Sequence, residues 1–174
     1  MAESIVAEDW YGEEIVDRTF VDCSFHDVDL TEATTLRTVF QECTFGNVKF
    51  NASRHTDSAF LRCAFARTNF FEAAFTGCKM TGSTFTDCDL RPLAVTGGDW
   101  SFVGLAGADL RGVTFRGVRM REVDLTGANC EGATLASSTC RAPSWPGSGS
   151  RAATCAGATC RRWTRPTRSS PGRS

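Results

Sequence analysis

The sequence lacks the features of a membrane or secreted protein. No apolar run approaches the roughly 20 residues that a membrane-spanning helix needs. The first nine residues include three acids and have neither the basic start nor the apolar stretch of a secretory signal. Histidine is limited to His26 and His55, and no Cys-x-x-Cys pair supports a zinc site. We therefore expect a cytoplasmic protein without membrane contact, metal or other cofactor.

Catalytic motifs are missing as well. The chain has no nucleophile elbow, phosphate-binding loop or paired acid motif. His55 is a candidate base, but a lone histidine at an inward position more often fills space and hydrogen-bonds a neighbour, here the Thr35 hydroxyl. We therefore expect a protein that is not an enzyme, with no catalytic residues.

A ladder of large apolar residues with a period of five organises the chain from Trp10 to Leu135, and only Thr35 and His55 on it are polar. The residue two positions before each ladder residue is mostly small. A period of five fits neither a helix nor a flat strand, so it indicates a repeat architecture with a narrow core.

Residue types recur at a longer period of twenty. Three columns at this spacing carry identical side chains: Phe25, Phe45, Phe65 and Phe85; Phe20, Phe40 and Phe60; Cys23, Cys43 and Cys63. Four five-residue units should therefore make one turn, and turns should stack at about 4.8 Å, the spacing of neighbouring strands. We assign these aromatic and thiol side chains to the structural core.

Segments such as Cys43-Thr44-Phe45, Ala108-Asp109-Leu110 and Ala128-Asn129-Cys130 resemble the A-(D/N)-L-x-x unit of pentapeptide-repeat proteins. The resemblance implies an all-β fold, a right-handed quadrilateral parallel β-helix of six to seven coils. We place a lead-in at residues 1–9, the β-helix at residues 10–136 and an irregular tail at residues 137–174. The stretches 53–60 and 89–93 are similar to the mycobacterial fluoroquinolone-resistance members of this family, and more distantly to the Qnr proteins, whose loops this chain lacks.

Nine cysteines would suggest disulfides in a small secreted protein. Five of them instead occupy the small inward position, where a thiol acts as a compact apolar group: Cys23, Cys43, Cys63, Cys78 and Cys88. We expect these thiols to be free and buried. We also expect Trp10 and Tyr11 to close the first coil, because a terminal repeat must cover the exposed end of the core.

Charge is distributed unevenly along the chain. Residues 1–50 hold 11 acids and 3 bases, whereas residues 51–136 hold 9 of each. Asp9, Asp29, Asp89 and Asp109 share one column, interrupted by Lys49 and Asn69. Asp22 and Glu42 lie on another face near the acidic end. An acidic surface does not bind nucleic acid directly, but it can take the place of DNA on a DNA-binding protein.

The family resemblance implies such a role. It predicts a DNA mimic that binds DNA gyrase, modulates its activity and protects against fluoroquinolones, with these six carboxylates as the partner-binding residues. The alternative is a structural or scaffold solenoid with an unrelated protein partner.

The tail carries 7 arginines and no acid. Cys140, Cys155 and Cys160 keep the five-residue register, and each follows a threonine. In a GC-rich gene, an Asp-Leu pair read one base late becomes Thr followed by Cys or Trp, so the pattern predicts a frameshifted tail. The C-terminal module through which the family forms homodimers would then be missing, which puts a dimer in doubt. The alternative is a natural basic arm that binds nucleic acid.

Overall fold

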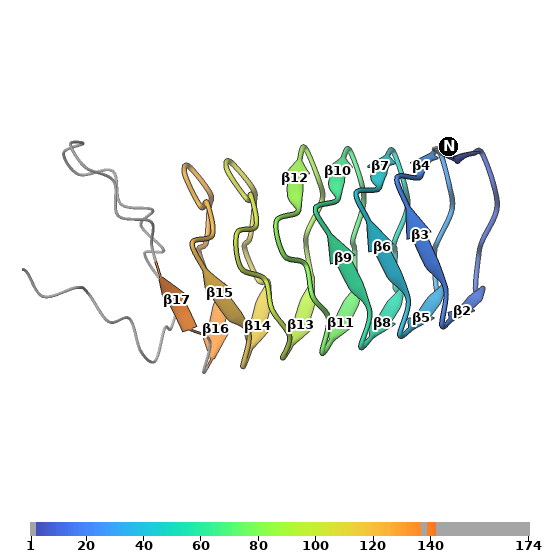
Figure 1. The fold of residues 1–174 in the computed structure, drawn as a ribbon. Coiled ribbons are helices and arrows are strands. Elements are labelled where there is room, and N and C mark those ends of the chain that lie inside the picture. Colours follow the sequence, from blue (N-terminus) through green and yellow to red (C-terminus); the bar gives the residue numbers. More distant parts are fainter. Residues whose placement is uncertain (1–2, 137–138, 142–174) are drawn as a thin grey trace, which may run out of the picture.

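The structure is a computed structural model that describes residues 3–136 and 139–141. The chain winds into a parallel β-helix of about seven turns with four flat sides (Figure 1). This confirms the fold predicted from the five-residue ladder. The described part of the chain contains no helix that could cross a membrane.

Short parallel strands of three residues form three of the four sides, which we name after their first strands. The β1 side contains β1 (Ser4–Val6), β4 (Ser24–His26), β7 (Thr44–Gly46), β10 (Ala64–Ala66) and β12 (Thr84–Thr86). The β2 side contains β2 (Glu14–Val16), β5 (Thr34–Leu36), β8 (Arg54–Thr56), β11 (Ala74–Thr76), β13 (Ala94–Thr96), β14 (Thr114–Arg116) and β16 (Thr134–Ala136). The β3 side contains β3 (Thr19–Val21), β6 (Val39–Gln41), β9 (Ala59–Leu61), β15 (Arg119–Arg121) and β17 (Thr139–Arg141).

The fourth side, which we call the bridge side, pairs through single residues. Asp9 bridges to Asp29, Asp29 to Lys49, and Lys49 to Asn69. All strand partners are twenty residues apart, for example Phe25 with Phe45. This register confirms four five-residue units per turn.

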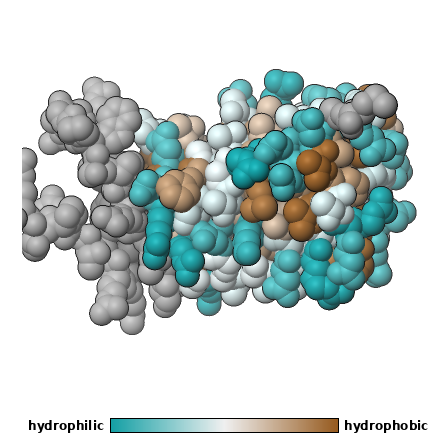
Figure 2. Space-filling model, in the orientation of Figure 1, coloured by the Kyte–Doolittle hydropathy of each residue, from teal (hydrophilic) through white to brown (hydrophobic). Residues whose placement is uncertain are grey.

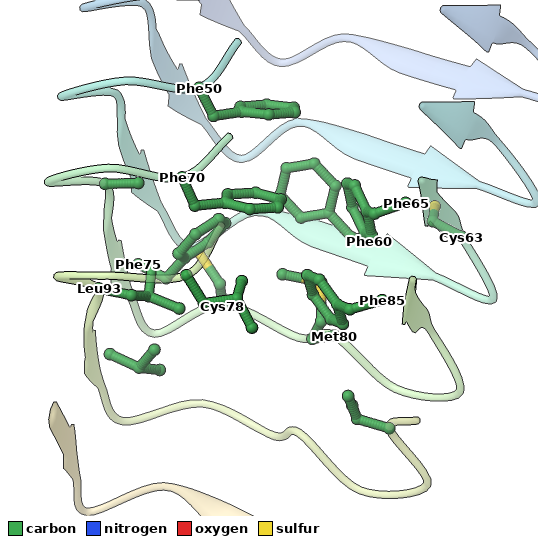
Figure 3. Close-up of a cluster of buried hydrophobic side chains, with 14 of the residues drawn as sticks. Phe50, Phe60, Cys63, Phe65, Phe70, Phe75, Cys78, Met80, Phe85 and Leu93 are labelled. Carbon is green, nitrogen blue, oxygen red and sulfur yellow. The ribbon is translucent and has the colours of Figure 1, made fainter. Parts of the chain in front are cut away.

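The ladder residues fill the axis of the coil (Figure 3). Phenylalanine rings stack face to face within a column, with centroids 4.8 Å apart for Phe25 and Phe45 and 4.7 Å apart for Phe45 and Phe65. Rings of neighbouring columns meet edge to face, as Phe60 and Phe75 do. Both arrangements suit the aromatic quadrupole, so the rings stabilise the stack beyond the area they bury.

Small side chains lie between the large ones. Cys43, Cys63 and Cys78 are almost fully buried and unpaired, and Cys88 is partly buried. The Cys63 thiol donates to the Phe40 carbonyl at 3.3 Å, so it satisfies a backbone acceptor of the previous coil.

The two polar ladder residues form a buried network. Thr35 Oγ1 and His55 Nδ1 are 2.8 Å apart, and Ser53 Oγ lies 3.0 Å from His55 Nε2. The hydrogen bond predicted between Thr35 and His55 is therefore present. Both ring nitrogens have partners, so His55 is a space-filling residue of the core.

The chain turns at the residue two places after each ladder residue. Sixteen described non-glycine residues have positive φ, and all occupy this position. Most are Asp, Asn, Glu or Arg, whose side chains project outward from the corner.

The first coil differs from the prediction in two respects. It begins with β1, where Ile5 is buried one ladder position before Trp10, inside the segment assigned as a lead-in. Trp10 packs against Phe20 and Phe25 and helps to close the core, but Tyr11 is 56% exposed. The prediction that Tyr11 closes the end was wrong, because it stands one place after the ladder and its side chain faces outward.

Candidate functional site

The column of carboxylates on the bridge side exists as a stacked row. Residue bridges run from Asp9 to Asp89 through Asp29, Lys49 and Asn69. Asp109 bridges separately to Asn129. The chain thus brings Asp9 and Asp29 next to each other, whereas Asp89 stands three coils beyond Asp29.

These carboxylates also build the turns that carry them. Asp29 Oδ1 accepts the Thr31 amide at 3.0 Å, and Asn69 Oδ1 accepts the Phe71 amide at 2.8 Å. Equivalent bonds join the amide two residues ahead to Asp9, Asp89 and Asp109. Aspartate and asparagine serve this role equally, because each supplies a side-chain oxygen at the same distance from the backbone.

Many acids are neutralised by a base one coil later. Asp29 lies 3.1 Å from Lys49, and Asp17 lies 2.7 Å from Arg37. The same spacing of twenty joins Glu42 to Arg62 and Asp99 to Arg119. Lys49, which interrupts the acidic column in the sequence, thus neutralises Asp29 in the fold. This pairing was not predicted, although the period of twenty contains the signal for it.

Asp109 is the most strongly neutralised of the six predicted partner-binding residues. Its carboxylate lies 2.7 Å from Arg111 and 3.0 Å from Arg91. The hydrogen bond from Arg111 is the main reason that the pKa of Asp109 falls to about 2. At Asp29, burial opposes ionisation, but hydrogen bonds from Thr31 and Lys49 outweigh it and lower the pKa.

Three of the six predicted residues, Asp29, Glu42 and Asp109, are thus held in ion pairs. The other three, Asp9, Asp22 and Asp89, have no ion pair within the described residues. A paired carboxylate is a poorer substitute for a DNA phosphate, because its charge is compensated before a partner arrives.

Carboxylates without an ion pair are concentrated at the N-terminal end of the solenoid. We call this group the acidic end; among the described residues it comprises Glu3, Glu8, Asp9, Glu13, Glu14, Asp22, Asp27 and Glu32. Arg18 is the single base in residues 3–32, and its guanidinium lies over the Phe20 ring at 5.3 Å. Six of these eight acids were not among the predicted site residues, because they lie on several sides of the solenoid and no single column contains them.

An apolar patch interrupts the charged surface on the β3 side. Figure 2 shows apolar side chains over β6 and β9, surrounded by hydrophilic ones. Val39 and Leu61 are partly exposed there, and Val21 on β3 is 50% exposed. A DNA backbone has no such area, so the β3 side of the N-terminal half differs from DNA at this patch.

The surface hollows are open. One of about 460 Å³ lies at the end of the solenoid against Trp10, Ile15 and Phe20. Another of about 490 Å³ lies beside β12, against Gly104 and Asp124. Within residues 3–136 and 139–141, no three His, Cys, Asp or Glu side chains are grouped as a metal ion would require. Burial lowers the pKa of His55 to about 3, so the imidazole is neutral at physiological pH.

The pentapeptide-repeat family model matches the chain in eight copies, over residues 56–91 and 105–139. None of the curated protein sequences matches it. Among solved structures, a trypsin-treated variant of QnrB1, a plasmid-mediated fluoroquinolone resistance protein, is 15% identical with a TM-score of 0.49, over 81% of this chain and 92% of that one. HetL, a pentapeptide repeat protein of the cyanobacterium Nostoc involved in heterocyst differentiation regulation, is 13% identical with a TM-score of 0.28, over 79% of this chain and 76% of that one. The chain therefore carries pentapeptide repeats.

Proposed function

We propose that this pentapeptide-repeat solenoid is a non-enzymatic DNA mimic that binds DNA gyrase in the cytoplasm, modulates its activity and protects it from fluoroquinolones. The observation that carries the proposal is the acidic end, where eight carboxylates without ion pairs cover the first coils of a narrow rod. The resemblance of the repeats to the mycobacterial protein MfpA supplies the identity of the partner.

The imitation of DNA is local. Duplex DNA carries one charge per about 1.7 Å along its whole length. In this chain, ion pairs at Glu42 and Asp99 remove negative charge beyond the first coils, and residues 51–136 hold as many bases as acids. We therefore propose that the acidic end enters the basic DNA path first and that the more neutral coils follow.

A gyrase supercoiling assay tests this function. We expect the protein to reduce supercoiling, and to reduce drug-induced cleavage of DNA when a fluoroquinolone is present. Pull-downs with the ATPase and cleavage domains taken separately would identify the part of gyrase that is bound. An absence of any effect in both assays, together with no binding to either domain, would exclude gyrase as the partner.

The apolar patch of Val21, Val39 and Leu61 favours a second candidate function, a scaffold solenoid that binds an unrelated protein through its β3 side. Apolar area on a flat sheet is suited to burial against a protein and contributes nothing to mimicry of phosphate. Leu61→Lys separates the two functions. It should leave gyrase binding intact if the acidic end is the interface, and it should abolish binding of a scaffold partner.

A further inference from the structure

The first coil, residues 3–22, leaves the edges of its strands unpaired. β1, β2 and β3 each stand at the end of their sheet. Elsewhere on the β2 side the amide of a strand's first residue donates to the coil before it, as Thr34 does to Glu13 at 2.9 Å and Arg54 does to Ala33 at 3.0 Å. Glu14 holds this position in β2, and within the described residues no earlier coil offers it a carbonyl. The edge of β2 is therefore a template for another strand.

An open hollow of about 460 Å³ adjoins this edge. Its apolar part is formed by Trp10, Ile15 and Phe20, which are three of the four ladder residues of the first coil. Its rim carries Asp9, Glu13, Glu14 and Arg18. In Figure 1 each later coil stacks against the coil before it, and all ladder residues from Phe25 to Met120 are buried.

The first coil also exposes apolar side chains at one register. Six large hydrophobic residues are exposed among those the structure describes, and four belong to this coil, one on each side: Val6, Tyr11, Val16 and Val21. Natural edge strands are commonly protected by charge, proline or a covering segment. The valines on the three edge strands are instead 42% to 54% exposed, which is typical of an edge that another segment covers.

The charges beside β2 specify what fits there. Along one corner, Asp17 accepts two hydrogen bonds from Arg37, and Asp57 follows one coil later, so charge alternates along the column. A strand added before β2 would continue this alternation with a base next to Asp17. A second base would lie next to Glu14, and an apolar residue between them would cover Ile15.

We propose that the β2 edge and the adjoining hollow bind an extended segment of a partner protein. The segment has four consecutive positions: a basic residue, an apolar residue, any residue and a second basic residue. The segment adds a strand to the β2 side, its apolar side chain enters the hollow and its bases pair with Glu14 and Asp17. This mode of recognition takes affinity from the backbone and specificity from alternate side chains. The proposed site shares Glu14 with the acidic end but differs from the gyrase interface in its partner chemistry, and it stands whether or not gyrase binds.

Charge excludes a second copy docked end to end, because acids would face acids at Glu13 and Glu14. The chain's own tail contains a matching run, Arg162-Trp163-Thr164-Arg165, outside the described residues. Since the tail is predicted to be frameshifted, we assign the site to a partner protein.

Fluorescence anisotropy with a labelled Thr-Arg-Val-Thr-Arg peptide and the full chain tests the proposal. We expect saturable binding that weakens at least tenfold when Glu14→Lys reverses the charge beside β2, and also when serine replaces valine in the peptide. Glu122→Lys is the matched control on the protein, with the same charge change near the other end, and should bind the peptide normally. Amide hydrogen exchange at Glu14 and Val16 should slow when the peptide binds.

Three results would overturn the proposal. Equal binding of the serine peptide would mean attraction by charge alone. If the wild-type chain dimerises and Val16→Asp abolishes the dimer, a second copy would be the occupant. If the Glu14 amide is protected from hydrogen exchange in the absence of peptide, and Trp163→Asp removes that protection, the tail would be the occupant.

Discussion

His55 is the residue whose ionisation should most affect stability. It is buried, and burial lowers its pKa from an ordinary 6.5 to about 3. An unfolded chain takes up this proton near pH 6.5 and the folded chain does not, so stability falls as pH drops from 6.5 toward 3. The linkage amounts to about 1.4 kcal/mol per pH unit.

His55→Phe should remove that part of the pH dependence. Phenylalanine is the residue that stacks on His55 in the next coil, Phe75, at a centroid distance of 4.5 Å. Thr35 keeps its bond to Ser58, and Ser53 keeps its bond to the Phe50 carbonyl. In urea unfolding at pH 6.5 and pH 4.5, the wild type should lose about 2 to 3 kcal/mol more than the variant. An equal loss in both proteins would mean that His55 is protonated in the fold.

Gly98 is a position where a side chain cannot be accommodated. Its φ is +83°, and a Cβ there would overlap the carbonyl oxygen of Cys78. Gly112 has a similar φ of +71° but open space around it. Gly98→Ala should cost about 3 kcal/mol or more, and Gly112→Ala about 1 kcal/mol, because only the first adds a backbone clash to the conformational strain. Thermal melts compare the two, and equal losses would refute the close approach of the two coils at Gly98.

The five-residue turn is the element that makes the solenoid, and its side-chain bond can be tested at Asp29. Asp29→Asn keeps the oxygen that accepts the Thr31 amide and loses the charge, as Asn69 shows naturally. Asp29→Ala loses both. We expect alanine to cost about 1 kcal/mol in urea unfolding and asparagine less than about 0.5 kcal/mol. If asparagine costs as much as alanine, the ion pair with Lys49 is the stabilising contact.

At the element scale, the sequence was sufficient for the fold because the period of five sets both burial and turning. Phe45 and Cys43 could be assigned to the interior from spacing alone, since a shift of one residue would expose every ring. The same spacing failed for Tyr11, where an aromatic residue suggested closure but its register pointed outward. Ion pairs such as that of Asp17 and Arg37 depend on the reach and direction of long side chains. The sequence specifies these only in part, so the pairs could not be predicted from spacing alone.

The same limit applies to the candidate site. The surplus of acids in the first fifty residues was visible in the sequence, but the structure showed that Asp29, Glu42 and Asp109 are already paired. Glu13, Glu14 and Glu32 belong to the site because the fold brings the four sides together around one end of the solenoid.

For the whole molecule, the frameshift of the tail remains a sequence prediction. Of residues 137–174, predicted to be irregular, the structure describes Thr139–Arg141, which form β17 and pair with β15. Sequencing of the source gene, with the frame restored near codon 136, should yield further A-(D/N)-L-x-x units and return acids where Thr139, Thr154 and Thr159 now stand. Mass spectrometry of the native protein provides the check. A native chain that ends in Pro-Gly-Arg-Ser would refute the frameshift.

The central claim concerns the whole rod, namely that its N-terminal end is the surface that meets a basic DNA path. Asp22→Lys with Glu32→Lys reverses two exposed corner charges of the acidic end. Asp87→Lys with Glu122→Lys makes the same change at corners of the later coils, and all four residues share a positive φ. Since exposed charges contribute little to stability, both double variants should melt close to the wild type.

The most direct measurement is the affinity of gyrase for the wild type and these two double variants across a range of salt concentrations. We expect the acidic-end variant to bind at least tenfold more weakly at low salt and to lose much of its salt dependence, because electrostatic attraction is removed where contact occurs. The control variant should bind like the wild type. Equal affinities for all three proteins, or an equal loss in both variants, would contradict the assignment of the acidic end as the interface.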